Sequence, residues 1–509
     1  MVVTTTARRV APRVEYKWIV AAVFVCGMFM DILDTTIVNV ALPDLGREFH
    51  ADTTSIEWIV LGYLLSLAVW IPASGWIGDR LGTRRVFLFA LAMFTFASAL
   101  CGQAHSLGEL VGFRVLQGVG GGMLVPVGTA MLFRAFPPIE RAKASTVLIV
   151  PTVLAPAFGP ILGGWLVTDV SWRWIFYVNL PVGAFAFALG FLFLREEREG
   201  HAGRFDIPGF VLSGSGLATV LFALTQGPEK GWRSPEVLIT GFVGITLFAL
   251  LIVVETRTPE PLLALRLFGD RMFRNANIVL TLTYGSFIGV IFLMPLYLQD
   301  LRGFTPLESG LTTFPQALGV IASSQLVGRL YHRVGPRRLI VFGMLALSVI
   351  TLPLGFMTLG TSLWLIRGIM FTRGIAMTFA FVPLQAATYA NISPVDTGRA
   401  SAIYSTQRQV AAALGVATLG TVLISRVNSA TAGVTDPSAL AHGVLSGYRL
   451  AFLVGTGLVG LASLSGLLIR DEDAAATILS RQTVVSEPEP EPEPEPMPGT
   501  EAATQLQPR

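Results

Sequence analysis

The stretch GWIGDRLGTRR, residues 75–85, decides the fold because a related stretch returns later in the chain. Residues 328–338 read GRLYHRVGPRR, and five of the eleven positions are identical when the two stretches are aligned 253 residues apart. Each stretch follows a long apolar run and is rich in arginine, which holds a loop on the cytoplasmic side of a membrane. The repetition therefore predicts two related halves with the same orientation.

The apolar runs on either side of these loops predict an integral membrane protein. Of the 509 residues, 52% are hydrophobic and only 14% are charged, against about 25% charged in soluble domains. Stretches of about 18 or more apolar residues are long enough to span a bilayer. Fourteen such spans are predicted, near residues 17–42, 54–76, 85–103, 107–133, 143–167, 173–194, 207–226, 236–255, 276–298, 309–329, 339–358, 361–388, 400–426 and 447–469.

The predicted fold is an all-α integral membrane protein with two six-helix bundles and two additional central helices. Parallel halves of this kind occur in secondary transporters, with the substrate path between them. The predicted units are a cytoplasmic N-terminus (1–16), a first bundle (17–195), an inserted helix pair with flanking cytoplasmic segments (196–275), a second bundle (276–470) and a disordered acidic Glu/Pro-rich cytoplasmic tail (471–509).

The loop charges predict the orientation in the membrane. With both termini in the cytoplasm, most loop lysines and arginines lie inside, as the positive-inside rule requires. The outer loops then hold Arg47, Arg173, Lys230, Arg233 and Arg302. The basic stretch 8–17 leads into an apolar run without a small-residue cleavage site, so we expect no cleaved signal peptide. The expected location is the inner (cytoplasmic) membrane, as a multi-pass protein.

Several classes of chemistry are disfavoured by the residues. A phosphate loop for ATP needs a lysine after glycine, and none of Lys17, Lys143 and Lys230 follows one. A serine nucleophile needs an activating base, but all five histidines lie in loops or at span ends. Cys26 and Cys101 lie in apolar runs, which argues against a disulfide framework. We expect no enzyme, metal, cofactor or nucleic-acid partner.

The first span carries two carboxylates in MDILDTTIVNVALP, residues 30–43. At 100° per residue, Asp31, Asp34 and Thr35 share one helix face, with Asn39 on its flank. A charge at bilayer depth costs at least ~2.5 kcal/mol, so this face should look into the bundle. The alternative is that Asp34 lies at a solvated helix end before Pro43.

Five stretches resemble the major facilitator superfamily, specifically its fourteen-spanner drug:proton antiporter branch, and the resemblance covers residues 15–470. Besides the loop at 75–85, they are LDTTIVNVALP (33–43), LVGFRVLQGVGGG (110–122), APAFGPILGGWL (155–166) and SWRWIFYVNLPVG (171–183). The fourth stretch departs from the family pattern, because Ala155 stands where glycine is usual. Pro151 and Pro156 add two breaks that predict stronger kinking.

The resemblance implies a proton-coupled antiporter that exports drugs or other hydrophobic or cationic molecules by alternating access. It implies proton coupling or cation binding at Asp34 and Arg114, and the extra carboxylate Asp31 joins them as a candidate. The implied gating loop comprises Gly75, Asp79, Arg80, Gly82, Arg84 and Arg85, and the implied packing residues of the fifth span are Gly159, Pro160, Gly163 and Gly164. Secondary candidates are Gln117, Asn39, Arg408 and Gln409.

Two further expectations concern the loop and the cargo. Asp79 should pair with an arginine or face a helix N-terminus, and His332 replaces it in the second copy, so a latch would be asymmetric. The same fold also suits an exporter dedicated to one endogenous metabolite, peptide or lipid. An uptake symporter, a membrane enzyme and a receptor without transport are less consistent with the motifs. The expected partners are membrane lipids, protons and a small-molecule substrate, and an adaptor protein is left open.

Overall fold

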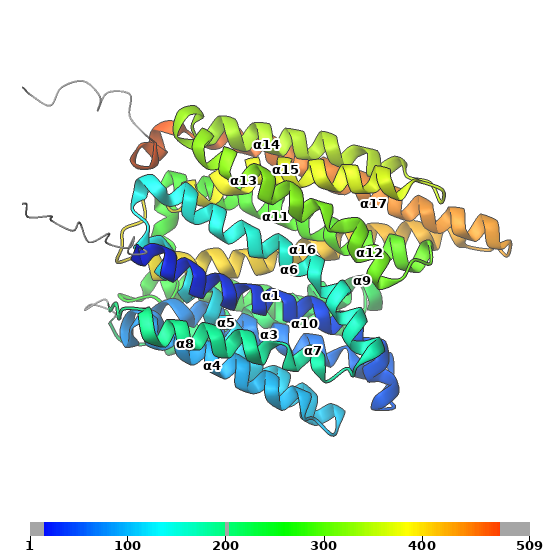
Figure 1. Ribbon diagram of the computed structural model, residues 1–509, viewed down its shortest axis with the longest axis horizontal. Coiled ribbons are helices and arrows are strands. Elements are labelled where there is room, and N and C mark those ends of the chain that lie inside the picture. Colours follow the sequence, from blue (N-terminus) through cyan, green and yellow to red (C-terminus); the bar gives the residue numbers. More distant parts are fainter. Residues whose placement is uncertain (1–14, 199–202, 479–509) are drawn as a thin grey trace, which may run out of the picture.

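The computed structural model describes residues 15–198 and 203–478, and all regular elements in those residues are helices. Long helices run side by side along the molecule, and both ends of the described chain lie at the same end (Figure 1). That end is termed the terminal face, and the opposite end the far face. Most of the predicted N-terminal segment and of the predicted acidic tail lies outside the described residues.

The long helices fall into two halves and an inserted pair. The first half comprises α1 (Tyr16–Glu48), α3 (Trp58–Leu81), α4 (Thr83–Gly102), α5 (Leu107–Ala135), α6 (Arg141–Asp169), α7 (Trp174–Tyr177) and α8 (Asn179–Phe193). The inserted pair is α9 (Ile207–Lys230) and α10 (Pro235–Arg257). The second half comprises α11 (Arg271–Leu296), α12 (Pro306–Thr313), α13 (Pro315–Val334), α14 (Pro336–Thr351), α15 (Leu363–Thr388), α16 (Thr397–Thr431) and α17 (Pro437–Ser465).

The number of spans agrees with the predicted fourteen-helix class. Thirteen helical stretches in the described residues are long and apolar enough to cross a membrane. The fourteenth is α13, which lies where the tenth span is predicted but carries Gln316, Gln325 and a basic end. Three predicted spans are interrupted. The second is divided at Glu57, between α2 (Thr53–Ile56) and α3. The tenth is divided at Phe314, just before Pro315, and the sixth is divided between α7 and α8.

The inserted helix α9 bridges the two halves, because it packs against both α3 and α16. Its partner α10 packs on α9 and presents bulky apolar residues to the outside, such as Phe242 and Ile245, which are 73% and 69% exposed. An apolar outer surface of this kind suits contact with lipid chains. The pair therefore covers the α3–α16 seam on its lipid side.

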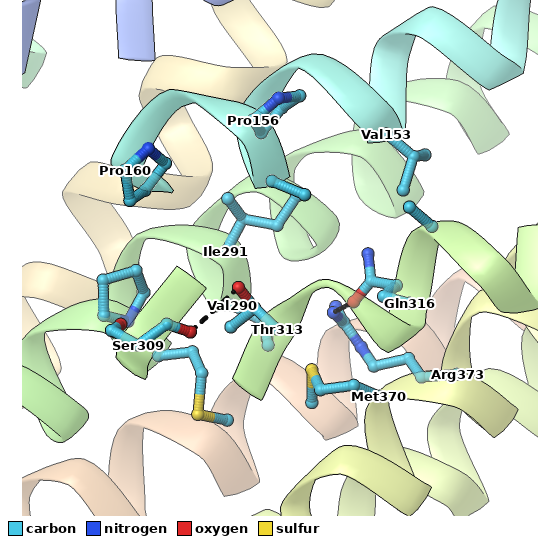
Figure 2. Close-up of a pocket in the computed structure, with 14 residues that line it drawn as sticks. Val153, Pro156, Pro160, Val290, Ile291, Ser309, Thr313, Gln316, Met370 and Arg373 are labelled. Atoms are coloured by element: carbon cyan, nitrogen blue, oxygen red, sulfur yellow. Dashed lines mark hydrogen bonds between the residues drawn. The ribbon is translucent and has the colours of Figure 1, made fainter. Parts of the chain in front are cut away.

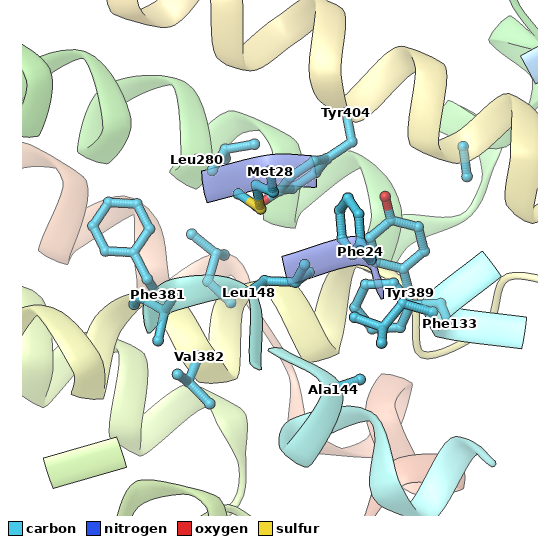
Figure 3. Close-up of a cluster of buried hydrophobic side chains, with 14 of the residues drawn as sticks. Phe24, Met28, Phe133, Ala144, Leu148, Leu280, Phe381, Val382, Tyr389 and Tyr404 are labelled. Atoms are coloured by element: carbon cyan, nitrogen blue, oxygen red, sulfur yellow. The ribbon is translucent and has the colours of Figure 1, made fainter. Parts of the chain in front are cut away.

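A hydrophobic cluster closes the space between the halves toward the terminal face (Figure 3). Phe24 and Phe133 come from the first half, and Tyr389 and Tyr404 come from the second. The rings of Phe133 and Tyr389 stack with centroids 4.1 Å apart, and those of Tyr389 and Tyr404 lie 5.8 Å apart. Aromatic pairs at this spacing stabilise the contact beyond the apolar area that they bury. The described conformation is thus closed at the terminal face.

The segment after each half packs on that half's basic loop. In the first half, the Thr83 amide donates to the Glu197 carbonyl oxygen at 3.0 Å. In the second half, the Arg337 amide donates to Asp471 Oδ1 at 2.8 Å. The predicted disordered tail therefore begins too early at residue 471, because Asp471–Thr477 form a 3-10 helix. Its small residues allow Ala474 to be buried, and the Glu-Pro repeat that opposes helix formation begins only at residue 487.

Candidate functional site

A buried ion pair joins α1 to α5 in the first half. Arg114 Nη1 lies 2.5 Å from Asp34 Oδ2, and both side chains are fully buried. The other carboxylate oxygen of Asp34 accepts hydrogen bonds from Gln117 Nε2 at 2.9 Å and from Asn179 Nδ2 at 3.0 Å. Arg114 Nε donates to the Ile59 carbonyl oxygen at 3.1 Å. Both oxygens of Asp34 thus have partners, as a charge at this depth requires.

Asp31, one turn earlier on α1, instead faces a central cavity of about 400 Å³ between the halves. The Tyr63 hydroxyl donates to Asp31 Oδ1 at 2.5 Å. The glycine at position 121 of α5 allows this arrangement: a Cβ there would lie 2.6 Å from the Tyr63 oxygen and 2.9 Å from Asp31 Oδ1. The Tyr63 ring also lies under the Arg114 guanidinium, 4.2 Å from its central carbon. Tyr63 therefore connects the cavity carboxylate to the buried ion pair.

The opposite wall of the cavity carries a guanidinium. Arg408 of α16 lines the cavity with its neighbour Gln409, and Arg408 Nη2 donates to the Tyr284 hydroxyl at 2.8 Å. The adjacent Gln407 turns away and donates to the Asn277 carbonyl oxygen at 2.7 Å. Most other lining residues are apolar, and α9 contributes Leu221, Leu224 and Thr225. A volume of a few hundred Å³, apolar walls and a few polar groups are typical of small-molecule sites.

The predicted loop at 75–85 is largely helical, and its residue Asp79, in the last turn of α3, makes contact with the second half. Arg134 Nη2 lies 2.8 Å from Asp79 Oδ1, and Arg134 Nε donates to the Pro394 carbonyl oxygen at 3.1 Å. Asp79 lies at the N-terminus of α16, where a Cβ on Gly398 would come within 2.7 Å of its carboxylate. Both expected interactions of Asp79 are therefore present, and a negative charge at a helix N-terminus is stabilised by the helix dipole.

Of the remaining residues of this motif, Gly75 also contacts the second half, whereas Arg84 and Arg85 bond within the first half or to the segment that follows it. A Cβ on Gly75 would lie 2.7 Å from the Gly398 carbonyl oxygen, so α3 and α16 approach closely there. Gly82 has φ of 99°, which glycine adopts without strain. Arg84 Nη2 donates to the Phe191 carbonyl oxygen at 2.6 Å, Arg85 Nε lies 3.4 Å from Glu196, and Arg80 is exposed.

The chain stays helical through Pro151, Pro156 and Pro160 of α6. Gly159 and Gly163 face α1, where added Cβ atoms would collide with Thr36 and Ile37. Pro160 faces the second half, together with Pro156 (Figure 2). Gly164 is farther from its nearest neighbour, because a Cβ there would stay 3.9 Å from Pro306. The small residues of α6 therefore permit close packing on one side, and its prolines shape the other.

Comparison with known proteins decides the family. Residues 24–416 match the Major Facilitator Superfamily. The chain belongs to this superfamily. Among its relatives is the multidrug resistance protein B homolog of Mycobacterium tuberculosis (strain CDC 1551 / Oshkosh). The two are 33% identical over 471 residues, which cover 86% of this chain and 87% of the relative. The putative multidrug resistance protein MdtD of Klebsiella pneumoniae is 35% identical, covering 80% of this chain and 85% of that protein.

A solved structure supports the facilitator fold. The crystal structure of the human organic anion transporter MFSD10 (TETRAN) matches with a TM-score of 0.62 over 88% of this chain and 99% of that chain. Sequence identity is 18%, so the likeness concerns the fold alone. The match to the superfamily and the all-α, fourteen-helix architecture of this chain confirm the predicted fold class. The protein is therefore a multi-pass membrane transporter.

The facilitator fold brings most of the predicted residues together but separates a few. Asp34, Arg114 and Gln117 meet in one buried cluster, whereas Asp31, Arg408 and Gln409 line the cavity. Asn39 is exposed and lies outside the lining, so its place on the helix flank does not bring it to the site. Sequence reasoning missed the roles of Asn179 and Gly121. The signals were an asparagine in an apolar stretch and a run of three glycines.

Proposed function

We propose that this facilitator is a proton-coupled antiporter that exports hydrophobic or cationic small molecules from the cytoplasm by alternating access. The observation that carries the proposal is the central cavity of about 400 Å³ between the halves. Among the described residues that line it, Asp31 is the only carboxylate. The relatives named as multidrug resistance proteins support a drug-like cargo.

The chemistry of Asp31 suits an exchange between a proton and a substrate cation. A carboxylate in a largely apolar cavity takes up a proton more readily than one in water, because burial disfavours its charged form. A cationic substrate that approaches Asp31 favours the ionised form instead. Proton and substrate then compete for one group, so inward release of the proton can follow outward release of the substrate.

The ion pair behind the cavity gives Asp34 a different role from Asp31. Asp34 is enclosed by Arg114, Gln117 and Asn179 and is absent from the cavity lining. Its charge holds the Arg114 guanidinium over the Tyr63 ring, and the Tyr63 hydroxyl contacts Asp31. Asp34 thus positions the residues around Asp31, and a change of charge at either carboxylate acts on the other through Arg114 and Tyr63.

The direction of transport follows from the proposed orientation. We assign the terminal face to the cytoplasm because the arginine-rich loops lie there, as the positive-inside rule predicts. The described conformation is then the one closed toward the cytoplasm, with the aromatic cluster as its plug. One proton that moves across ~100 mV supplies about 2.3 kcal/mol, which is enough for tens-fold accumulation of substrate outside.

A second candidate function is favoured by Arg408 on the wall opposite Asp31. A cavity with one carboxylate and one guanidinium complements a molecule that carries charges of both signs. Such a cargo would suit an exporter dedicated to one endogenous zwitterion. The two candidates differ in whether neutralising Arg408 weakens the transport of zwitterionic compounds.

The test is a proton-release assay in inverted membrane vesicles with a panel of cationic, neutral and zwitterionic compounds. Asp31→Asn should abolish proton release driven by substrate, because it removes the carboxylate in the cavity. Asp34→Asn should also lower it strongly, together with the amount of folded protein. Asp44→Asn, the same change at the far end of α1, is the matched control and should leave proton release unchanged.

Variants of the carboxylates and of Arg408 distinguish the possible results of this assay. Substrate-dependent proton movement that is unchanged in both Asp31→Asn and Asp34→Asn would exclude the proposed coupling. Arg408→Gln should leave cationic substrates largely unaffected under the first candidate. A loss confined to zwitterionic substrates would favour the dedicated exporter.

A further inference from the structure

The second half contains a buried arginine without a carboxylate partner. Arg373 of α15 is 2% exposed. Its Nη1 donates to Gln316 Oε1 at 2.8 Å, and its central carbon lies 5.7 Å from the centre of the Phe287 ring. Its Nε has no hydrogen-bond partner. In residues 15–198 and 203–478, Arg373 takes part in none of the described ion pairs. Its partners are therefore an amide oxygen and an aromatic face, both uncharged.

A small cavity lies beside this guanidinium (Figure 2). Its volume is about 60 Å³, and it lies between α6 of the first half and α11, α12, α13 and α15 of the second. Its polar lining residues are Arg373, Gln316, Ser309 and Thr313. The Ser309 hydroxyl is buried and has no hydrogen-bond partner, whereas the Thr313 hydroxyl already donates to the Ser309 carbonyl oxygen at 3.2 Å. The unused groups, the Arg373 Nε–H and the Ser309 hydroxyl, can thus both donate a hydrogen bond.

The energetics favour a negative charge in this cavity. Arginine stays protonated in proteins, and a buried charge without a countercharge destabilises a fold. The Gln316 oxygen offsets part of that penalty but carries no charge. Free N–H and O–H donors around a small space are what an anion needs for recognition. A drug-sized molecule is excluded by size, since its sites span several hundred Å³.

We propose that this cavity binds a small anion of the size of chloride or formate, which provides the countercharge for Arg373. The α6 side of the cavity consists of Val153, Pro156, Ala157 and Pro160, so the anion lies at a contact between the two halves. Separation of α6 from the second half would open the cavity. Anion binding therefore stabilises the described conformation relative to any in which that contact is broken. The inference does not rest on proton coupling or on the central cavity.

The test measures thermal unfolding of the purified full-length chain in detergent. Sodium gluconate is replaced stepwise by sodium chloride or sodium formate at constant ionic strength, because gluconate is too large for the cavity. The wild-type unfolding midpoint should rise by about 2 °C and then saturate, as expected for a ligand that binds only the folded state. A response to chloride and formate alike indicates a general small-anion site, and a response to chloride alone indicates a monoatomic anion. Both outcomes support the proposal.

Two variants and one control identify the site. Arg373→Met should remove the chloride response. Gln316→Glu should also remove it while raising the midpoint in gluconate, because the new carboxylate supplies the countercharge from within the chain. If Arg373→Met does not fold, the chloride response of Gln316→Glu alone decides whether the cavity is the anion site. Arg367→Met changes an arginine on the same helix outside the cavity lining, and its chloride response should equal that of the wild type.

Two results would overturn the proposal. One is a wild-type midpoint that is the same in chloride, formate and gluconate. The other is a chloride response that persists at full size in both Arg373→Met and Gln316→Glu, since the anion would then act elsewhere on the protein.

Discussion

The two halves share a fold but differ in the charged residues at corresponding positions. At the spacing of 253 residues that aligns the basic loops, Asp31 corresponds to Tyr284, Asp34 to Phe287, and Tyr63 to Gln316. The first half therefore holds carboxylates where the second half holds rings. Both halves bury an arginine, but Arg114 faces Asp34 whereas Arg373 faces Gln316. The difference teaches that charge compensation is internal at Arg114 and incomplete at Arg373.

The largest expected effect comes from breaking the internal compensation. Arg114→Met leaves Asp34 buried without a cation, which should destabilise the protein by about 3–5 kcal/mol. The readout is the yield of monodisperse protein and its unfolding midpoint in detergent. Arg373→Met in chloride-free buffer is the comparison variant in the second half. It leaves no carboxylate unpaired, so its stability should equal or exceed that of the wild type.

A double variant separates charge from packing at this site. Arg114→Met combined with Asp34→Asn removes both charges and should recover a large part of the lost stability, because no buried charge is left alone. If the double variant is no more stable than Arg114→Met, lost packing rather than the orphaned charge explains the effect. The contrast between the halves would then have to be abandoned.

A smaller effect is expected at the contact that links the ion pair to the cavity. Gly121→Ala places a Cβ 2.6 Å from the Tyr63 hydroxyl oxygen and 2.9 Å from Asp31 Oδ1. Relief of this overlap should lower the free energy of unfolding by about 1–3 kcal/mol. It should also reduce substrate-driven proton release about 10-fold. The matched control is Gly112→Ala on the same helix, where a Cβ meets nothing within 4 Å. That change should be neutral or slightly stabilising, and equal losses in both variants would contradict the proposed link.

The smallest effect is expected at the loop, where the two copies also differ. Asp79→Asn removes a charge from the N-terminus of α16 and from Arg134, which should shift the balance between conformations by about 1 kcal/mol. The measurement is maleimide labelling from the terminal face of a Tyr404→Cys variant, with labelling of Cys26 and Cys101 subtracted. We expect labelling to increase about 5-fold. His332→Asn, the change at the corresponding position of the second copy, should leave labelling unaltered.

Much of the fold could be predicted from the sequence because it depends on local composition. Apolar runs predict the fourteen spans, and the polar face of α1 predicts that Asp31 and Asp34 look inward. What the helix pattern could not predict is which carboxylate reaches the cavity. That choice depends on Arg114 and Asn179, which reach Asp34 from α5 and α8. Contacts between distant helices are not encoded in the period of one helix.

The same reason explains the other differences. Gln407 and Arg408 are sequence neighbours, yet Gln407 bonds to α11 whereas Arg408 lines the cavity. Asn39 lies on the flank of the polar face but is exposed, because no neighbouring helix covers that flank. The helix at Asp471–Thr477 depends on packing against Tyr331, whose hydroxyl lies 2.7 Å from Thr477 Oγ1. The alternating Glu and Pro of the tail predicts disorder and does not reveal this contact.

The packing of each basic loop on the end of its own half sets an order of events during synthesis. The hydrogen-bond partner of Arg337 lies 134 residues further along the chain, and that of Thr83 lies 114 residues further. At about 5–20 residues per second, a ribosome needs roughly 6–27 s to make such a stretch. The backbone amides of Thr83 and Arg337 therefore lack these hydrogen-bond partners until the last helix of each half has been made. For the second half, this contact cannot form before residue 471 has been made.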